Sequence, residues 1–205
     1  MPLFMLEKKL VLFIHVPKAG GSSIEHFLAP HYVGLMDTSY PGGLPCSPQH
    51  FHAALLSIVL KNSPIDYKFM VVRHPLRRLE SEYKFRKKHF GDVKNMDFEA
   101  WVAHALETYL KNPYHLDNHL RPMTEFILPN TQVYKLEDGL ERLRDDLHSR
   151  YPTAIAKEKA IPHAHETGTE ERCGIASKEV ADLVYGFYKE DFERWYPDDH
   201  KLPAL

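Results

Sequence analysis

The chain has 205 residues, which is enough for one domain with a sizeable apolar core. Hydrophobic residues make up 43% and charged residues 26%, so we expect an ordinary soluble globular protein. The formal net charge of -2 excludes nucleic-acid binding by bulk positive charge, so a local cluster must hold any anionic ligand.

Cysteine content and hydropathy exclude several further classes of protein. Cys46 and Cys173 are far apart and form no CxxC pair, which excludes a disulfide scaffold and a cysteine-rich zinc site. The apolar run at residues 10–14 is too short to span a membrane. We see no signal peptide with a small-residue cleavage site, so we expect a cytoplasmic protein without a membrane span.

The most informative stretch begins with that apolar run. Residues 10–14 are nearly all apolar and predict a strand buried on both faces, as in a parallel sheet. The sequence PKAGG at residues 17–21 then predicts a turn whose last three residues have small side chains or none. Ser22 and Ser23 suit the cap of a following helix. The N–H groups of such a turn and the positive end of the helix dipole bind anions, and Lys18 adds a full charge.

The position of the lysine in this turn separates two kinds of phosphate loop. A Walker A loop, GxxxxGK[ST], has its lysine after the last glycine. Here Lys18 precedes Gly20 and Gly21. The order argues against an ordinary loop that cleaves ATP or GTP.

Strand and helix patterns alternate along the rest of the chain. We expect strands at residues 31–36, 67–73 and 131–135, and helices at residues 53–60, 76–88, 98–110, 140–149 and 177–195. Asp97 or Asn95 suits the cap of the helix at 98–110. Buried strands that alternate with helices predict right-handed βαβ units. The fold class is therefore α/β, with a P-loop-like three-layer fold, a central mostly parallel sheet flanked by helices, and a single domain over residues 1–205.

A second candidate anion site follows the strand at residues 67–73. Arg73 ends that strand, and Arg78 and Ser81 are three residues apart on the next helix, so they share a face. Arginine and a hydroxyl suit a second phosphate group. The alternative is that this helix is simply a solvated basic helix. That alternative accounts well for Lys87 and Lys88, but poorly for Arg73 at the end of a buried strand.

The two motifs together resemble a known family. PKAGGSS at residues 17–23 is similar to the 5′-phosphosulfate motif of sulfotransferases that use 3′-phosphoadenosine-5′-phosphosulfate (PAPS). The pattern RxPxxRxxSxY at residues 73–83 is similar to their 3′-phosphate motif. The layout is most similar to the Golgi-type carbohydrate sulfotransferases and their small bacterial relatives.

The resemblance implies specific roles for the residues of both motifs. The 5′-phosphosulfate would be bound by Lys18, Ala19, Gly20, Gly21, Ser22 and Ser23. Arg73 and Ser81 would bind the 3′-phosphate with help from Arg78, and residues 163–169 would close over the adenosine. PAPS would be the co-substrate and adenosine 3′,5′-bisphosphate (PAP) the product, with no metal ion.

Sulfonate transfer to a hydroxyl needs a general base, and histidine is suitable near neutral pH. His50 and His52 follow a loop rich in proline and glycine, and some uronyl 2-O-sulfotransferases resemble this chain in having a histidine pair at this point. Either histidine fits the catalytic role, and we favour His50 because it is nearer to the loop. His119 and Arg121 are candidates for the acceptor site, although loop packing explains them equally well.

We therefore expect in-line transfer of the PAPS sulfonate to a hydroxyl acceptor, either a carbohydrate or another small alcohol. Nucleic acid is not an expected partner. One alternative is a kinase-like phosphotransferase, which predicts a lysine after the glycines and a metal-binding acid at a strand end. Another is a non-catalytic nucleotide-binding module, which would not depend on His50 or His52. The acceptor and the oligomeric state stay open at this point.

Overall fold

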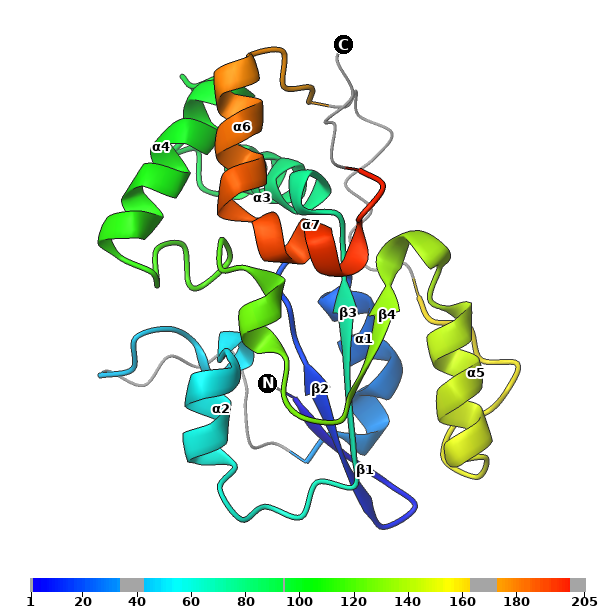
Figure 1. Ribbon diagram of the computed structural model, residues 1–205. Helices are drawn as coiled ribbons and strands as arrows, with labels where there is room; N and C mark the ends of the chain where they lie inside the picture. Colours follow the sequence, from blue (N-terminus) through cyan, green and yellow to red (C-terminus); the bar gives the residue numbers. More distant parts are fainter. Residues whose placement is uncertain (1, 34–42, 94, 163–172, 200–205) are drawn as a thin grey trace. The chain divides into compact units, whose positions relative to one another are not determined.

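The computed structural model describes residues 2–33, 43–93, 95–162 and 173–199 (Figure 1). It divides into two compact units. The first unit comprises Met1–Arg73 and Glu125–Glu166, and the second comprises His74–Thr124 and Thr167–Leu205. That the chain forms a single domain stays a prediction.

The first unit contains a four-stranded sheet in the order β1-β2-β3-β4. β1 (Leu3–Leu6) is antiparallel to β2 (Lys9–Ile14), whereas β2, β3 (Tyr67–Val72) and β4 (Thr131–Lys135) are mutually parallel. The three parallel strands lie where the sequence predicts them. The α/β class with a mostly parallel sheet flanked by helices is confirmed, and it is consistent with a three-layer fold.

The strand β1 was not predicted, and its turn explains why. Glu7 and Lys8 join β1 to β2, and both have positive φ angles, 48° and 65°. Two-residue hairpin turns of this hand usually contain asparagine or glycine, and neither is present here. The sequence therefore carries no hairpin signal at this position.

Two helices of the first unit cover one face of the sheet. These are α1 (Gly21–Leu28) and α5 (Glu141–Arg150), and a third helix, α2 (Ala53–Val59), belongs to the same unit. Because side chains alternate along a strand, every second residue faces the two covering helices. The shared core contains Val11, Phe13, Ile24, Phe27, Phe69, Val71, Leu143 and Leu147.

The strand expected at residues 31–36 is wrong for the part that the structure describes. Residues Ala29–His31 form one 3-10 turn, and Tyr32 makes a single bridge to Phe4 of β1. Pro30 lies in this turn, where it fixes a backbone angle compatible with a helical turn and offers no N–H to a sheet. Residues 34–36 lie outside the described residues.

The second unit is helical. It contains α3 (Pro75–His89), α4 (Phe98–Lys111), α6 (Lys178–Phe187) and α7 (Lys189–Trp195). The predicted helices at 76–88 and 98–110 are confirmed to within one residue at each end. Asp97 accepts a hydrogen bond from the Ala100 N–H at 2.8 Å, so the predicted cap of α4 is also confirmed.

The prediction of one helix over residues 177–195 is wrong, because α6 and α7 meet at Tyr188. This residue is buried, and its hydroxyl donates to the Leu120 carbonyl at 2.7 Å. Leu120 is far away in the sequence, so the apolar periodicity of residues 177–195 does not reveal the break.

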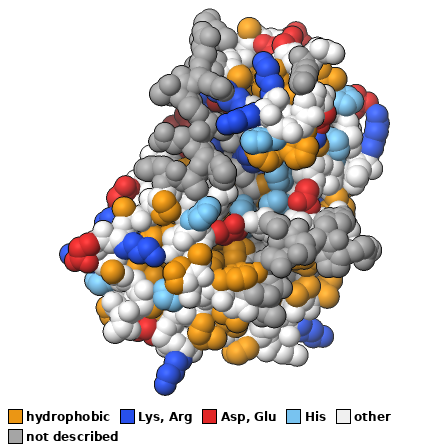
Figure 2. Space-filling view, turned by 180° about the vertical axis from the view of Figure 1, so that it is seen from behind, with side chains coloured by type: hydrophobic (Ala, Val, Ile, Leu, Met, Phe, Trp, Pro, Cys, Tyr) orange, Lys and Arg blue, Asp and Glu red, His pale blue; other side chains and the backbone are white. Residues whose placement is uncertain are grey.

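The surface agrees with the small net charge. Figure 2 shows acidic and basic side chains interspersed on one face of the molecule, with hydrophobic side chains between them. Among the helices that the structure describes, none combines the length and the apolar character needed to cross a membrane.

Candidate functional site

We call residues 15–21 the anion loop; it joins β2 to α1 and includes Gly21, the first residue of the helix. Lys18 is half-buried and has a left-handed backbone with φ 65°, and Gly20 follows with φ 85°. Gly20 is the N-cap of α1, which begins at Gly21. The predicted serine cap is therefore wrong, since Ser22 and Ser23 lie inside the first turn, where the Ser23 N–H donates to the Gly20 carbonyl at 3.2 Å.

Both glycines of the loop are required by their surroundings. A β-carbon added to Gly20 would lie 2.9 Å from Leu136 Cδ1, and the positive φ of Gly20 disfavours a side chain in any case. A β-carbon added to Gly21 would lie 2.4 Å from the ring of His15. The side chains of Leu136 and His15 thus pack against the loop and leave no room for a β-carbon at either glycine.

Arg73 joins the anion loop from the neighbouring strand. It directly follows β3, and its Nη1 donates to the Lys18 carbonyl at 3.2 Å. Parallel pairing of Ile14 with Met70 brings the carboxyl ends of β2 and β3 together, which is why Arg73 lies against the loop. Lys18, Arg73 and the N-terminus of α1 place three sources of positive charge in one region of the first unit.

His50 lies close to this region within the first unit. It ends the 3-10 turn Pro48–His50, is buried, and has its Nδ1 3.1 Å from the Ser47 hydroxyl oxygen. Its ring also meets the ring of His15 edge-on, with centroids 5.2 Å apart. His52 is buried as well, but it is the N-cap of α2. The ring contact connects His50 to the anion loop, because His15 covers Gly21.

Arg78 and Ser81 both lie on the buried side of α3 in the second unit, as their spacing predicts. The Arg78 guanidinium donates to the His119 carbonyl at 3.0 Å and twice to the Arg121 carbonyl at 3.2 Å. These contacts give Arg78 a clear structural role, which the sequence did not predict. A contact of Arg78 or Ser81 with a 3′-phosphate stays a prediction.

The candidate acceptor residues His119 and Arg121 belong to an unusual loop of the second unit. Three consecutive residues before them, Leu116, Asp117 and Asn118, have positive φ angles of 54°, 54° and 69°. Non-glycine residues in this conformation are sparse and tend to gather at functional sites. The turn contains no glycine, so the sequence does not indicate its left-handed backbone.

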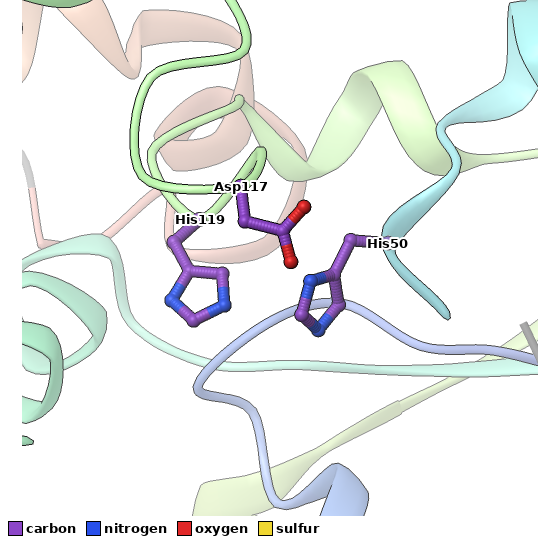
Figure 3. Close-up of side chains that lie close together, drawn as sticks. All are labelled: His50, Asp117 and His119. Carbon is purple, nitrogen blue, oxygen red and sulfur yellow. The ribbon is translucent and has the colours of Figure 1, made fainter. Parts of the chain in front are cut away.

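Side chains of the second unit hold this loop in place. The Nδ1 of His119 lies 2.7 Å from a carboxylate oxygen of the buried Glu82, and Arg121 Nε donates to Asn118 Oδ1 at 2.6 Å. Figure 3 shows Asp117 and His119 on this loop, and His50 on the segment before α2. Residues 163–169, predicted to close over the adenosine, lie outside the described residues.

In the first unit, Lys18, Arg73 and the N-terminus of α1 gather positive charge at the carboxyl ends of parallel strands, the edge at which α/β sheets commonly bind their ligands. A family model described as "Sulfotransferase family" matches residues 1–197. The chain therefore belongs to the sulfotransferase family and is a transferase of sulfonate groups. No curated protein and no solved structure matches this chain.

Proposed function

We propose that this protein transfers the sulfonate of PAPS to a hydroxyl acceptor and releases PAP. The observation that carries this proposal is the hydrogen bond from Arg73 to the Lys18 carbonyl, at 3.2 Å. This hydrogen bond places Arg73, which follows β3, against the loop that contains Lys18 and follows the neighbouring strand β2. A nucleotide with phosphates at both its 3′ and 5′ ends suits this pair of positive groups.

The residues of the loop would bind the phosphosulfate end. Lys18 supplies a charge. The donors would be the N–H groups of Ala19 and Gly20 before α1, those of Gly21 and Ser22 at its start, and the hydroxyls of Ser22 and Ser23. Arg73 and Ser81 would bind the 3′-phosphate, with Arg78 as a helper. This assignment rests on the resemblance of the two motifs to the family and on the charge gathered around the loop.

In the transfer step, a bond forms between the acceptor oxygen and sulfur while the bond from sulfur to the bridging phosphate oxygen breaks. Negative charge grows on the bridging oxygen, and Lys18 and the helix N-terminus stabilise it there. With this positive charge supplied by the protein, the step requires no metal ion.

His50 accepts the proton of the acceptor hydroxyl in this mechanism. The edge-on contact with His15, which covers Gly21 of the anion loop, favours His50 over His52. The acceptor in this proposal is a carbohydrate or another small alcohol, and His119 and Arg121 stay candidates, from the sequence alone, for contacts with it. Because the imidazole must be neutral to take the proton, the rate of transfer should fall as the pH drops through the histidine range.

Ligand stabilisation separates this proposal from a kinase-like phosphotransferase. Thermal unfolding is measured with PAP and with ATP at equal concentrations, because a ligand that binds the folded state raises its melting temperature. We expect PAP to stabilise the protein more than ATP does. Stabilisation by ATP alone would contradict the proposal.

Transfer of labelled sulfonate from PAPS to a panel of glycans, phenols and small alcohols separates the enzyme from a binding module. We expect turnover on at least one acceptor, and His50→Ala should lose it by about 10²-fold or more while PAP still binds. His52→Ala is the matched control and should keep more activity. No turnover on any acceptor would leave only nucleotide binding.

A further inference from the structure

Glu25 lies between two segments that the proposed function requires. It belongs to α1, one helical turn after Gly21. Its Oε1 lies 2.5 Å from His15 Nδ1. Gln49 Nε2 donates to the same carboxylate, at 2.8 Å to Oε1 and 2.9 Å to Oε2. One side chain therefore contacts the residue after β2 and the segment before α2.

The charge of Glu25 determines where the His15 proton lies. Burial raises the pKa of Glu25, but the hydrogen bond and charge of His15 and the hydrogen bond from Gln49 outweigh it, so the pKa lies below its ordinary value. Glu25 is then ionised at neutral pH and can only accept hydrogen bonds. His15 must carry a proton on Nδ1 to donate to it.

The contact with His15 reaches the anion loop. The ring of His15 lies against Gly21 so closely that no β-carbon fits between them, as the distance of 2.4 Å shows. The ring is nearly buried, and the carboxylate holds its Nδ1. The position of the ring therefore limits the backbone of Gly21, which contributes the first N–H of α1.

The contact with Gln49 reaches the candidate base. Gln49 precedes His50 in the 3-10 turn Pro48–His50, and the His50 N–H donates to the Ser47 carbonyl at 2.9 Å. The ring of His50 packs edge-on against His15. Glu25 thus acts on His50 twice, through the backbone of its neighbour and through the ring that it packs against.

We propose that Glu25 is a positioning residue that holds the anion loop and the His50 segment in one arrangement. This inference rests on the proposed function for its catalytic meaning. The Glu25 carboxylate accepts hydrogen bonds from two residues, His15 and Gln49. A glutamine at position 25 has one oxygen that can accept, but its NH₂ group, a donor, would face one of these two donors. Small displacements of a base cost much in rate, because transfer requires near-attack geometry.

The test compares three single variants by turnover and by PAP affinity. Glu25→Gln should lower kcat by about 10²-fold and also weaken PAP binding, because it disturbs both segments. Gln49→Ala should lower kcat by about tenfold with little change in PAP affinity, because it disturbs the His50 segment alone. Glu107→Gln removes an exposed carboxylate on α4, paired with Lys111 at 2.6 Å, and should change neither quantity.

The different effects of each variant on kcat and on PAP affinity distinguish a positioning role from a general loss of stability. Melting temperatures of all variants are measured in parallel, and Gln49→Ala keeps the test informative if Glu25→Gln folds poorly. Turnover and PAP affinity of Glu25→Gln within about twofold of wild type would overturn the proposal. Losses of equal size in every variant, explained by a smaller folded fraction, would overturn it too.

A spectroscopic measurement keeps this inference separate from the proposed function. Long-range ¹H–¹⁵N spectra of the imidazole rings report which nitrogen carries the proton. We expect His15 to be protonated at Nδ1 in wild type, and the rings of both His15 and His50 to shift in Glu25→Gln. Unchanged ring signals would overturn the inference, even if the wild type transfers sulfonate. Shifted signals would support it, even if no acceptor is found.

Discussion

At the scale of single residues, the anion loop combines an uncommon backbone with a close steric fit. Lys18 adopts a left-handed conformation, which costs a non-glycine residue about 1–2 kcal/mol. The hydrogen bond from Arg73 to the Lys18 carbonyl helps to offset that cost. Such strained residues often belong to functional sites, so the backbone of Lys18 supports the assignment of this loop.

Gly21→Ala tests the steric fit. The new methyl group would lie 2.4 Å from the His15 ring, so we expect a loss of about 1–3 kcal/mol in the free energy of unfolding, together with weaker PAP binding. Gly186→Ala is the control, since a β-carbon there meets nothing within 4 Å and the residue lies inside α6. This substitution should stabilise the protein by about 0.5–1 kcal/mol in urea unfolding. Equal effects of the two substitutions would contradict the assigned packing.

The Glu25 carboxylate predicts a pH dependence of stability. Its folded-state pKa lies below the ordinary value of 4.5. The unfolded chain therefore binds more protons as the pH falls below 4.5, so the stabilisation by Glu25 is complete above pH 4.5 and is lost through the folded-state pKa. The urea midpoints of wild type and Glu25→Gln should differ at neutral pH and converge on acidification. A constant gap down to about pH 3 would show that Glu25 is not the titrating group.

At the scale of elements, buried polar side chains fix the segment between α4 and β4. Arg78 donates to the carbonyls of residues 119 and 121, and Tyr188 donates to the carbonyl of residue 120. Asp191 is fully buried and accepts hydrogen bonds from the Met123 and Thr124 N–H groups, both at 2.8 Å. Buried hydrogen bonds within the second unit therefore hold the candidate acceptor loop.

Arg78→Lys should weaken this support. An ammonium group cannot reproduce the planar fork of a guanidinium, so carbonyls buried beside it lose donors. We expect a loss of about 2 kcal/mol in the free energy of unfolding, measured in urea. The control is Lys88→Arg at an exposed position of α3, which should stay within about 0.5 kcal/mol of wild type. An Arg78→Lys variant as stable as wild type, with PAP binding lost, would assign Arg78 to the nucleotide alone.

The sequence predicts elements whose signals are local. The strand at residues 131–135 and the helix starting at Phe98 follow from apolar pattern and an aspartate cap. The division of the last helix at Tyr188 and the left-handed residues 116–118 depend on contacts with distant parts of the chain. The proximity of Arg73 to Lys18 could be predicted from the sequence, because parallel strands end at one edge of a sheet. The role of Glu25 could not be predicted, because nothing in the sequence pairs Glu25 with Gln49.

At the scale of the whole molecule, the sequence places this chain in its family through two short motifs. The family match extends over residues 1–197, far beyond those motifs. The net charge of -2 gives no indication of the acceptor, because it favours neither a polyanionic glycan nor a small alcohol. The assignment of function therefore depends most on Lys18, the residue that distinguishes this loop from a Walker A loop.

The central claim is that Lys18 serves sulfonate transfer from PAPS. Its most direct test measures labelled sulfonate transfer and PAP affinity for wild type and Lys18→Ala. Because Lys18 stabilises charge that develops during transfer, we expect kcat to fall by about 10²–10³-fold and PAP affinity to fall much less. Equal losses of turnover and PAP affinity would show that Lys18 only holds the ground-state phosphate, and would contradict this account.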